Sequence, residues 1–224
     1  MTLVGFWNIQ RASNPERERF EFVGSLIEEW VNGKLDAPAP ELLVLAEVTQ
    51  TGESMAAWLL GFGGYEAEYI AVGGKKDRDA PSPCSFLVFG RRPLPRARPT
   101  GDASVRPMIK LRVGNVTVAA LHNAARGEPA KEETLIACEE NRDGASLILG
   151  DINYDLRDIG STERREFARY RFAPQDPGMG MTFRSGKVFD YALTNPGVHA
   201  VARPPVRGYD AWDIVDHAPI AYEF

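Results

Sequence analysis

The sequence predicts an α/β fold in which two mixed β-sheets pack together and helices cover their outer faces, giving a four-layer α/β/β/α sandwich. Short apolar runs typical of buried strands recur along the chain. Helical patterns separate some of these runs, and two-residue turn signals separate others. Because strand–helix–strand units alternate with hairpins, and because no linker divides the chain, we expect one domain over residues 1–224.

The first half is expected to begin with a strand–helix–strand unit. Residues 4–7 form the first apolar run, and Asn14 with Pro15 is expected to begin a helix. Four apolar residues recur on one face of that helix: Phe20, Val23, Ile27 and Trp30. The run Leu42–Ala46 is the second strand. A helix over residues 53–60 and strands over residues 66–72 and 84–89 are expected to follow.

The second half combines hairpins with helices. Gly114-Asn115 is a strong hairpin signal between residues 108–113 and 116–121, and Ser185-Gly186 is a second one between residues 181–184 and 187–193. Further elements are expected at residues 129–140 (helix), 146–149 (strand), 162–170 (helix) and 219–222 (strand). Residues 91–99 contain three prolines and four arginines, which indicates a loop or an edge strand.

Composition is that of an ordinary soluble globular protein, with 44% hydrophobic and 25% charged residues in 224. No apolar run approaches the roughly 20 residues that a membrane helix needs. The N-terminus has no basic segment followed by an apolar core, so we expect a cytoplasmic protein. The two cysteines, Cys84 and Cys138, lack metal-type spacing and are expected to be reduced core residues. A net charge of −5 argues against a tight non-specific DNA binder but does not exclude a nuclease.

Several of the apolar runs end on a polar residue that can bind metal or phosphate. The runs end on Asn8, Glu47, His122 and Asp151, and Asn153 follows two positions later. Polar groups at strand ends can meet on one rim of a layered domain, where loops hold them over a rigid base. These residue types are the ones needed to bind Mg²⁺ and hydrolyse a phosphoester.

Asp151 and Asn153 form the most informative motif, Gly-Asp-Ile-Asn at the end of a strand. If the strand conformation persists, residues two apart face the same side and could hold a water and a phosphate oxygen. The structural alternative is an Asx turn, in which the side chains bond their own backbone. From the motif alone these interpretations are equally supported.

Asp190 and His217 suggest a second pair. A general base needs a pKa near the working pH and an orienting carboxylate. Asp190 interrupts an apolar strand, where a charge is costly unless it is paired. Pairing with His217 is one interpretation, and a structural salt bridge for Asp190 with a solvated turn around His217 is the other. His199 has no comparable neighbours and is assigned to structure or surface.

Six blocks in sequence order together resemble the endonuclease/exonuclease/phosphatase superfamily. They are Trp7-Asn8-Ile9-Gln10, Ala46-Glu47, Leu121-His122, Gly150-Asp151-Ile152-Asn153, Phe189-Asp190-Tyr191 and Asp216-His217-Ala218-Pro219. The superfamily includes pancreatic-type deoxyribonucleases, abasic-site endonucleases, the catalytic subunit of cytolethal distending toxin, inositol polyphosphate 5-phosphatases and sphingomyelinases. The resemblance is specific for fold and phosphoesterase chemistry, and it does not name the substrate.

The resemblance implies that one group of these residues binds the metal ion and another positions the nucleophilic water. Glu47 resembles the principal Mg²⁺ ligand, with Asn8 beside it and Asp216 as another carboxylate on the metal side. Mn²⁺ is a possible substitute for Mg²⁺. Asp151 and Asn153 resemble the pair that positions the nucleophilic water and the phosphate.

The remaining roles are implied in the same way. Asp190 and His217 resemble the carboxylate–histidine dyad of the family, and His122 resembles its second histidine. Thr182 lies where members often place a small residue that contacts phosphate. His217 acts either as the base or as a hydrogen-bond donor to the phosphoryl group, and Asp151 is the alternative group for activating water.

The chain also departs from the family pattern. Members often have Gln before the metal-binding Glu, whereas this chain has Ala46. The block around Asp190 disfavours the 5-phosphatase branch. The carboxylate partner of His122 is left open between Glu66 and Glu68.

The expected function is a Mg²⁺-dependent phosphodiesterase, most naturally a nuclease that cleaves nucleic-acid phosphodiester bonds by in-line attack of water. Asn8, Asn153 and His122 would supply hydrogen-bond donors to the phosphoryl oxygens. Six arginines could follow a phosphate backbone: Arg91, Arg92, Arg96, Arg98, Arg106 and Arg112. Their alternative role is to pair with the acidic excess. A phosphatase or phosphodiesterase acting on a small-molecule or lipid phosphoester is the main competitor, and a non-catalytic binding module is the third hypothesis. The oligomeric state, the number of metal ions and endo- versus exo-cleavage are not decided by the sequence.

Overall fold

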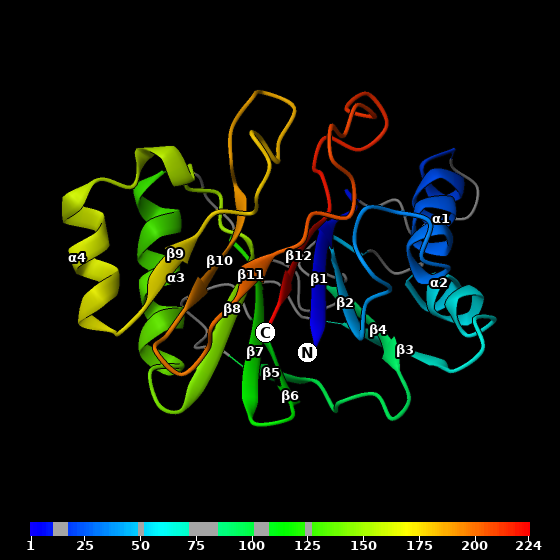
Figure 1. The fold of residues 1–224 in the computed structure, drawn as a ribbon, viewed down its shortest axis with the longest axis horizontal. Coiled ribbons are helices and arrows are strands. Elements are labelled where there is room, and N and C mark those ends of the chain that lie inside the picture. The colour runs from blue at the N-terminus through cyan, green and yellow to red at the C-terminus, as the bar shows by residue number, and fades with distance from the viewer. Residues whose placement is uncertain (11–17, 49–51, 72–84, 101–107, 124–126) are drawn as a thin grey trace.

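Two six-stranded sheets lie face to face between two pairs of helices in the computed structural model (Figure 1). The structure describes residues 1–10, 18–48, 52–71, 85–100, 108–123 and 127–224. Helices α1 (Glu18–Val31) and α2 (Gly52–Leu59) cover one outer face, and α3 (Glu128–Glu140) and α4 (Ser161–Arg169) cover the other. The predicted four-layer sandwich is therefore confirmed.

The first sheet is built around a parallel pair of strands from the N-terminal part of the chain. β1 (Leu3–Asn8) pairs in parallel with β2 (Leu42–Ala46), and α1 lies between them in sequence. The strand order is β11-β12-β1-β2-β4-β3. The other four strands are β3 (Tyr65–Ile70), β4 (Phe86–Arg91), β11 (Val201–Ala202) and β12 (Ile220–Glu223).

The second sheet repeats this plan. β7 (Val116–His122) pairs in parallel with β8 (Ala145–Asp151), and α3 lies between them in sequence. The strand order is β5-β6-β7-β8-β10-β9. Its other strands are β5 (Arg98–Thr100), β6 (Met108–Val113), β9 (Ala173–Gln175) and β10 (Asp190–Thr194), and a short 3₁₀ helix η1 (Leu156–Asp158) follows β8.

Alternate side chains of the central strands belong to different cores. On β1, Val4 and Phe6 face the core between the sheets, whereas Leu3 and Trp7 face the helices α1 and α2. A third core lies between the second sheet and the helices α3 and α4. Strands buried on both faces have no polar face to alternate with, which is why the sequence shows continuous apolar runs.

The two parallel pairs bring the polar run ends to one rim. In the register of the sheets, Asn8 is opposite Ala46, the residue before Glu47. On the second sheet, Asp151 is opposite His122 on one side and Asp190 on the other. The ends of these neighbouring strands therefore place the polar residues side by side at one end of each sheet.

Gly150 permits a close approach of two strands immediately before Asp151. A Cβ atom at this position would lie 1.9 Å from the backbone oxygen of Leu121 on β7. No side chain fits at that distance, so the glycine is required for β7 and β8 to pair at the point where both reach the rim.

Helices α2, α3 and α4 begin and end within one residue of their predicted bounds, and so do the strands of the first predicted hairpin. The second predicted hairpin is wrong, because residues 181–184 form only an isolated bridge between Phe183 and His217, and β10 begins at Asp190 and pairs with β8 and β9. The backbone N–H groups of Thr182 and Phe183 both donate to the carbonyl of Lys187, which closes a tight turn without a ladder. The short strands β9 and β11 were not predicted.

Some expectations fall outside the described residues, namely the helix start at Asn14 and Pro15 and the placement of Cys84. Cys138 is buried with a free thiol, as predicted. None of the described helices has the length and apolar character needed to cross a membrane.

We predict that Gly150→Ala lowers the free energy of unfolding by at least about 3 kcal/mol, because the added methyl group must push two paired strands apart. Urea denaturation followed by circular dichroism measures this. Gly180→Ala is the matched control, since its added Cβ would meet nothing within 4 Å. Equal stability of the two variants would contradict the close approach seen at Gly150.

Candidate active site

Asp151 occupies the centre of the polar rim. Its carboxylate is almost completely buried, and Oδ2 accepts a hydrogen bond of 3.0 Å from the side-chain amide of Asn8. The Nε2 atoms of His122 and His217 lie 3.6 and 3.7 Å from the same oxygen. One carboxylate oxygen thus faces three polar groups that come from both sheets and from the C-terminal segment.

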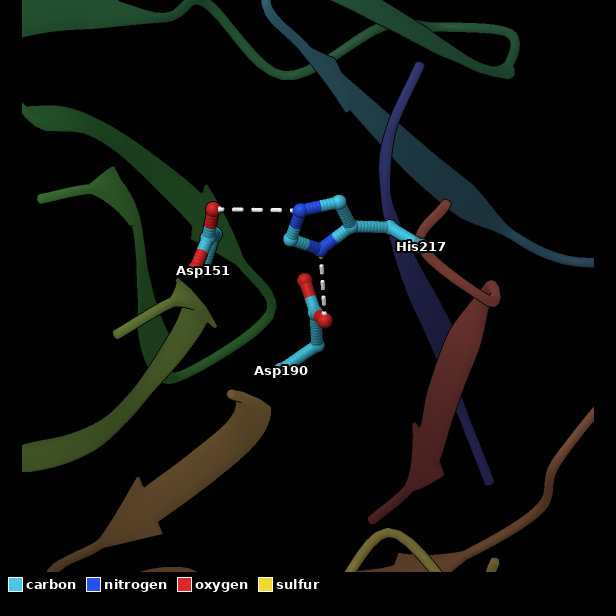
Figure 2. A group of neighbouring side chains, drawn as sticks. All are labelled: Asp151, Asp190 and His217. Atoms are coloured by element: carbon cyan, nitrogen blue, oxygen red, sulfur yellow. Dashed lines mark hydrogen bonds and ion pairs between the residues drawn. The ribbon is translucent and has the colours of Figure 1, made fainter. Parts of the chain in front are cut away.

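His217 and Asp190 form the tightest pair at this rim (Figure 2). The imidazole Nδ1 lies 2.8 Å from Asp190 Oδ2, and Asp190 is fully buried. Figure 2 shows the imidazole between the two carboxylates, with Nδ1 toward Asp190 and Nε2 toward Asp151. Because Nδ1 is engaged, Nε2 is the atom left to act on a substrate.

The charges around His217 favour its protonated form. Burial alone would lower the pKa of His217, but the negative charges of Asp190, Asp151 and Asp216 outweigh burial and raise that pKa above its ordinary value. Burial raises the pKa of Asp190, and the charge of His217 and its hydrogen bond oppose this rise. In the metal-free protein we therefore expect a charged imidazole that donates from Nε2.

Glu47 joins the same group from the first sheet. Its Oε1 lies 3.3 Å from His122 Nε2 and accepts a hydrogen bond of 3.2 Å from the Asn8 amide. Burial raises the pKa of Glu47, but His122, the Asn8 amide and the charge of His217 together lower it to about 2. Glu47 is therefore an ionised oxygen ligand at neutral pH.

Asn8 lies between two of the acidic site residues, and its predicted metal and phosphate contacts stay predictions. Its Nδ2 donates to both Glu47 and Asp151, and its Oδ1 accepts from the backbone N–H of Gln10 at 3.1 Å. Asn8 therefore presents amide hydrogens to the two carboxylates and holds them in place.

Gln10 was not predicted as a site residue. Besides the contact with Asn8, its Oε1 accepts a hydrogen bond of 2.9 Å from the backbone N–H of Asp216. Trp7 makes a similar link, since its indole N–H donates to the carbonyl of His217. The first strand thus fixes the C-terminal Asp216-His217 segment. Only the short distance of both residues from Asn8 in the sequence could have indicated this.

Asp216 carries a buried oxygen to which none of the described residues donates a hydrogen bond. Its Oδ1 lies 3.6 Å from His217 Nε2 but in no hydrogen-bond geometry. Such an orphaned buried acceptor is costly unless something binds it. Oxygen ligands of this kind are preferred by Mg²⁺ and similar divalent cations. The residues present therefore fit a divalent metal.

The Asp151–Asp190–His217 group is a further place that could hold a metal, because one ligand atom of each lies within 4.8 Å of the others. However, Asp190 is completely buried and its Oδ2 binds the imidazole Nδ1. The carboxylates of Glu47 and Asp216 are the better candidates, because their side chains are 24% and 18% exposed and can reach a bound ion.

The loop after β8 forms the Asx turn that was one of the two interpretations of the Asp151 and Asn153 motif. The backbone N–H of Asn153 donates to Asp151 Oδ1 at 3.2 Å, and its side-chain amide donates to the carbonyl of Asn123 at 3.0 Å. Asn123 was missed by the sequence analysis, although its side chain also binds the carbonyl of Ile152. These bonds fix the loop after β8, so Asn153 lies beside the site with its amide turned toward β7.

Thr182 does not face the rim as a phosphate ligand would. It is fully buried, and its hydroxyl oxygen accepts from the backbone N–H groups of Phe189 and Asp190 at 3.0 and 2.9 Å. The predicted phosphate contact is therefore not supported. Thr182 instead fixes the start of β10, which carries Asp190.

Neither predicted carboxylate partner of His122 is found there. Glu66 accepts from the backbone N–H of Leu94 and pairs with Arg92, and Glu68 is exposed. Two described carboxylates lie near His122 Nε2, those of Glu47 and Asp151. His199 is exposed, as expected.

Arg91 and Arg112 do not lie at this rim. Arg91 follows Gly90, which is opposite Leu42 at the start of β2, whereas Glu47 follows the end of β2. Arg112 is likewise opposite Thr117, far along β7 from His122. Arg91 pairs with Glu41 and Arg92 with Glu66, each at 3.5 Å. The alternative role in ion pairs is the one observed for these two, and Arg106 lies outside the described residues.

We predict that His217 of the metal-free protein titrates well above an ordinary histidine, and that Asp190→Asn lowers its pKa by about 1–3 units. The sign follows because Asp190 stabilises only the charged imidazole. NMR titration of the three histidines in EDTA measures it, with the exposed His199 as internal control. An unchanged His217 midpoint in the variant would show that Asp190 does not set its charge.

Comparison with known proteins relies on structure. No protein-family model matches the sequence, and no curated protein matches it significantly. An endonuclease/exonuclease/phosphatase from Beutenbergia cavernae superimposes with a TM-score of 0.70 at 19% identity, covering 99% of this chain and 70% of that chain. The Neisseria 3′ phosphatase NExo, solved with a product DNA hairpin, gives a TM-score of 0.62 at 18% identity, covering 100% of this chain and 99% of that chain.

A third similar structure is the mannosyl-6-phosphatase Bt3783 from Bacteroides thetaiotaomicron. Its TM-score is 0.65 at 13% identity, covering 100% of this chain and 99% of that chain. These structures span nearly the whole chain, although the sequences have diverged widely. The chain therefore has the fold of the endonuclease/exonuclease/phosphatase superfamily, as the resemblance of its motifs predicted.

Proposed function

We propose that this protein is a metal-dependent phosphoester hydrolase whose substrate is a nucleic-acid phosphodiester. The observation that carries the proposal is the position of Asp151 Oδ2, which faces Asn8, His122 and His217 at one buried rim. A carboxylate between two imidazoles, beside further acidic groups, places proton acceptors and proton donors within a few ångströms of one another.

Asp151 is the group proposed to orient the attacking water and accept its proton. His217 is held in its charged form by Asp190, so it is better suited to donate a hydrogen bond from Nε2 to a phosphoryl oxygen than to act as the base. His122 would donate to a second phosphoryl oxygen. This assignment favours one of the two roles that the sequence left open for His217.

Glu47 and Asp216 are the proposed carboxylate ligands of Mg²⁺, with Mn²⁺ as a substitute. When bound, the metal would neutralise the charge that develops on the phosphoryl oxygens. Asn8 holds Glu47 against Asp151, and Gln10 holds the backbone of Asp216. The chain's own contribution is thus to fix several anionic groups that would repel one another without a cation.

The choice of a nucleic acid rests on the NExo structure, whose partner is a DNA hairpin, and on the retained Phe-Asp-Tyr block. A small phosphoester is the second candidate. It is favoured by the structural similarity to a sugar phosphatase and by the absence of Arg91, Arg92 and Arg112 from the rim.

We predict hydrolysis of at least one substrate in a panel of plasmid, single-stranded DNA, abasic DNA, RNA, inositol phosphates and sphingomyelin, with Mg²⁺ or Mn²⁺. EDTA should abolish it, because without the metal the carboxylates of Glu47 and Asp216 would repel the negatively charged phosphoryl group. Product analysis by gel and by phosphate release checks both candidates. No metal-dependent hydrolysis of any substrate would support a non-catalytic binding module instead.

We predict that His217→Ala and Glu47→Gln each lower kcat by about 10²–10³, the usual cost of removing one group that stabilises transition-state charge. Asp213→Asn removes an exposed carboxylate outside the site and serves as the control. Steady-state kinetics with thermal denaturation separates lost chemistry from lost folding. A folded His217→Ala enzyme with full activity would refute the assignment.

A further inference from the structure

A small pocket is lined mainly by two chain segments that also carry residues of the candidate active site. Its volume is about 130 Å³, well below the roughly 300–1,000 Å³ of a site for a drug-sized ligand. It has room for one ring-sized group. Two chain segments contribute most of its lining: residues 153–155 with Asp158, and Ser185, Lys187 and Phe189.

Both segments also carry residues of the active site. Asn153 lies two residues after Asp151, and Phe189 immediately precedes Asp190. Phe183 contacts a residue of each, with its ring centroid 5.3 Å from that of Phe189 in the pocket lining and 4.8 Å from that of His217 in the dyad. A group bound in the pocket would therefore sit next to a phosphate held at Asp151 and His217.

The charges of the pocket balance. The Asp155 carboxylate is saturated, because it accepts from Arg157 Nε and Nη2 at 3.1 and 2.8 Å and from the backbone of Val188. Lys187 and Asp158 remain, and neither forms an ion pair with any described residue. One free cation and one free anion leave no net charge for binding a second phosphate.

The remaining surface is mixed in character. Lys187 Nζ lies 5.5 Å from the centroid of the Phe189 ring, so the ammonium group and an aromatic wall occur together. Ser185, Asn153 and Tyr154 add hydroxyl and amide groups. Donors, acceptors and an apolar wall in one small cavity suit a ring with apolar C–H faces and hydroxyl groups at its edge.

We propose that this pocket binds an uncharged sugar ring esterified to the scissile phosphate, with Asp158 and Lys187 hydrogen-bonding its hydroxyl groups. The proposal rests on the proposed phosphoester hydrolysis for its position next to the reacting phosphate. The sugar could belong to a nucleotide or to a free sugar phosphate, and both offer the same ring chemistry to the pocket.

The test compares phosphoesters that carry a sugar with phosphoesters that do not. Bis(p-nitrophenyl) phosphate and p-nitrophenyl phosphate lack a sugar. Thymidine 5′-(p-nitrophenyl phosphate) carries the nucleotide sugar, and mannose 6-phosphate is a free sugar phosphate. The variants are Lys187→Met and Asp158→Asn, both at exposed positions, with Lys34→Met and Asp213→Asn as matched controls outside the pocket.

Each pocket variant should raise KM for the sugar-bearing ester about threefold to tenfold, the effect of one lost hydrogen bond. The ratio of kcat/KM between sugar-bearing and sugar-free esters should fall by the same factor, and the matched controls should keep the wild-type ratio. Which of thymidine ester and mannose 6-phosphate shows the effect identifies the source of the sugar. An unchanged ratio in both pocket variants would overturn the proposal while leaving the hydrolase function intact.

A binding measurement keeps the proposal testable if no ester is hydrolysed. Saturation-transfer NMR of thymidine 5′-phosphate and mannose 6-phosphate with metal-free protein should show contact at the sugar protons, weakened in both pocket variants. Absence of sugar contact in wild-type protein would refute the pocket assignment. Tighter binding of thymidine 3′,5′-bisphosphate to Asp158→Asn than to wild type, without sugar contact, would instead assign the pocket to a second phosphate.

Discussion

The hydrogen bond between Asp190 and His217 is the interaction on which the candidate site depends, because both groups are withdrawn from water. Removing one partner of a buried charged pair costs far more than a surface contact, since the other charge stays buried and unpaired. The pair joins β10 of one sheet to the segment before β12 of the other. Thr182 holds the start of β10, and Trp7 holds the carbonyl of His217. The sandwich must therefore close correctly before this dyad can form.

Backbone strain is concentrated at the same rim. Four described non-glycine residues have positive φ, and three of them, Gln10, Glu47 and Asn153, lie in the site. Each such conformation costs of order 1–3 kcal/mol unless its surroundings enforce it. Here hydrogen bonds enforce it, since Gln10 binds Asn8 and Asp216, and Asn153 binds Asp151. The strain turns the chain at the end of each strand, so that the polar side chains are held where the apolar runs stop.

The sequence was sufficient for the fold and for the group of polar residues, because both depend on patterns that local physics dictates. Continuous apolar runs specify doubly buried strands, and the polar residue after each run must lie at a strand end. The role of Thr182, the partner of His122 and the placement of Arg91 and Arg112 were not correctly predicted. Each depends on which atom of a side chain faces which neighbour, or on the register of strands distant in sequence. Gln10 and Asn123 were missed for the same reason, since an amide that bonds backbone groups leaves no pattern.

The distribution of charge limits how a polynucleotide could be held. Arg91, Arg92 and Arg112 lie toward the other ends of their strands, two of them pair with glutamates, and the chain carries a net charge of −5. Long-range attraction to a phosphate backbone from these arginines is therefore weak. Affinity would have to come from the reacting phosphate itself and from the group next to it, where a bound metal, two histidines and the proposed sugar pocket would act at short range. Few phosphates would then be neutralised, and binding would depend only shallowly on salt concentration. A site of this kind selects its substrate by the chemistry of one or two residues of the substrate, whether that substrate is a nucleic acid or a small phosphoester.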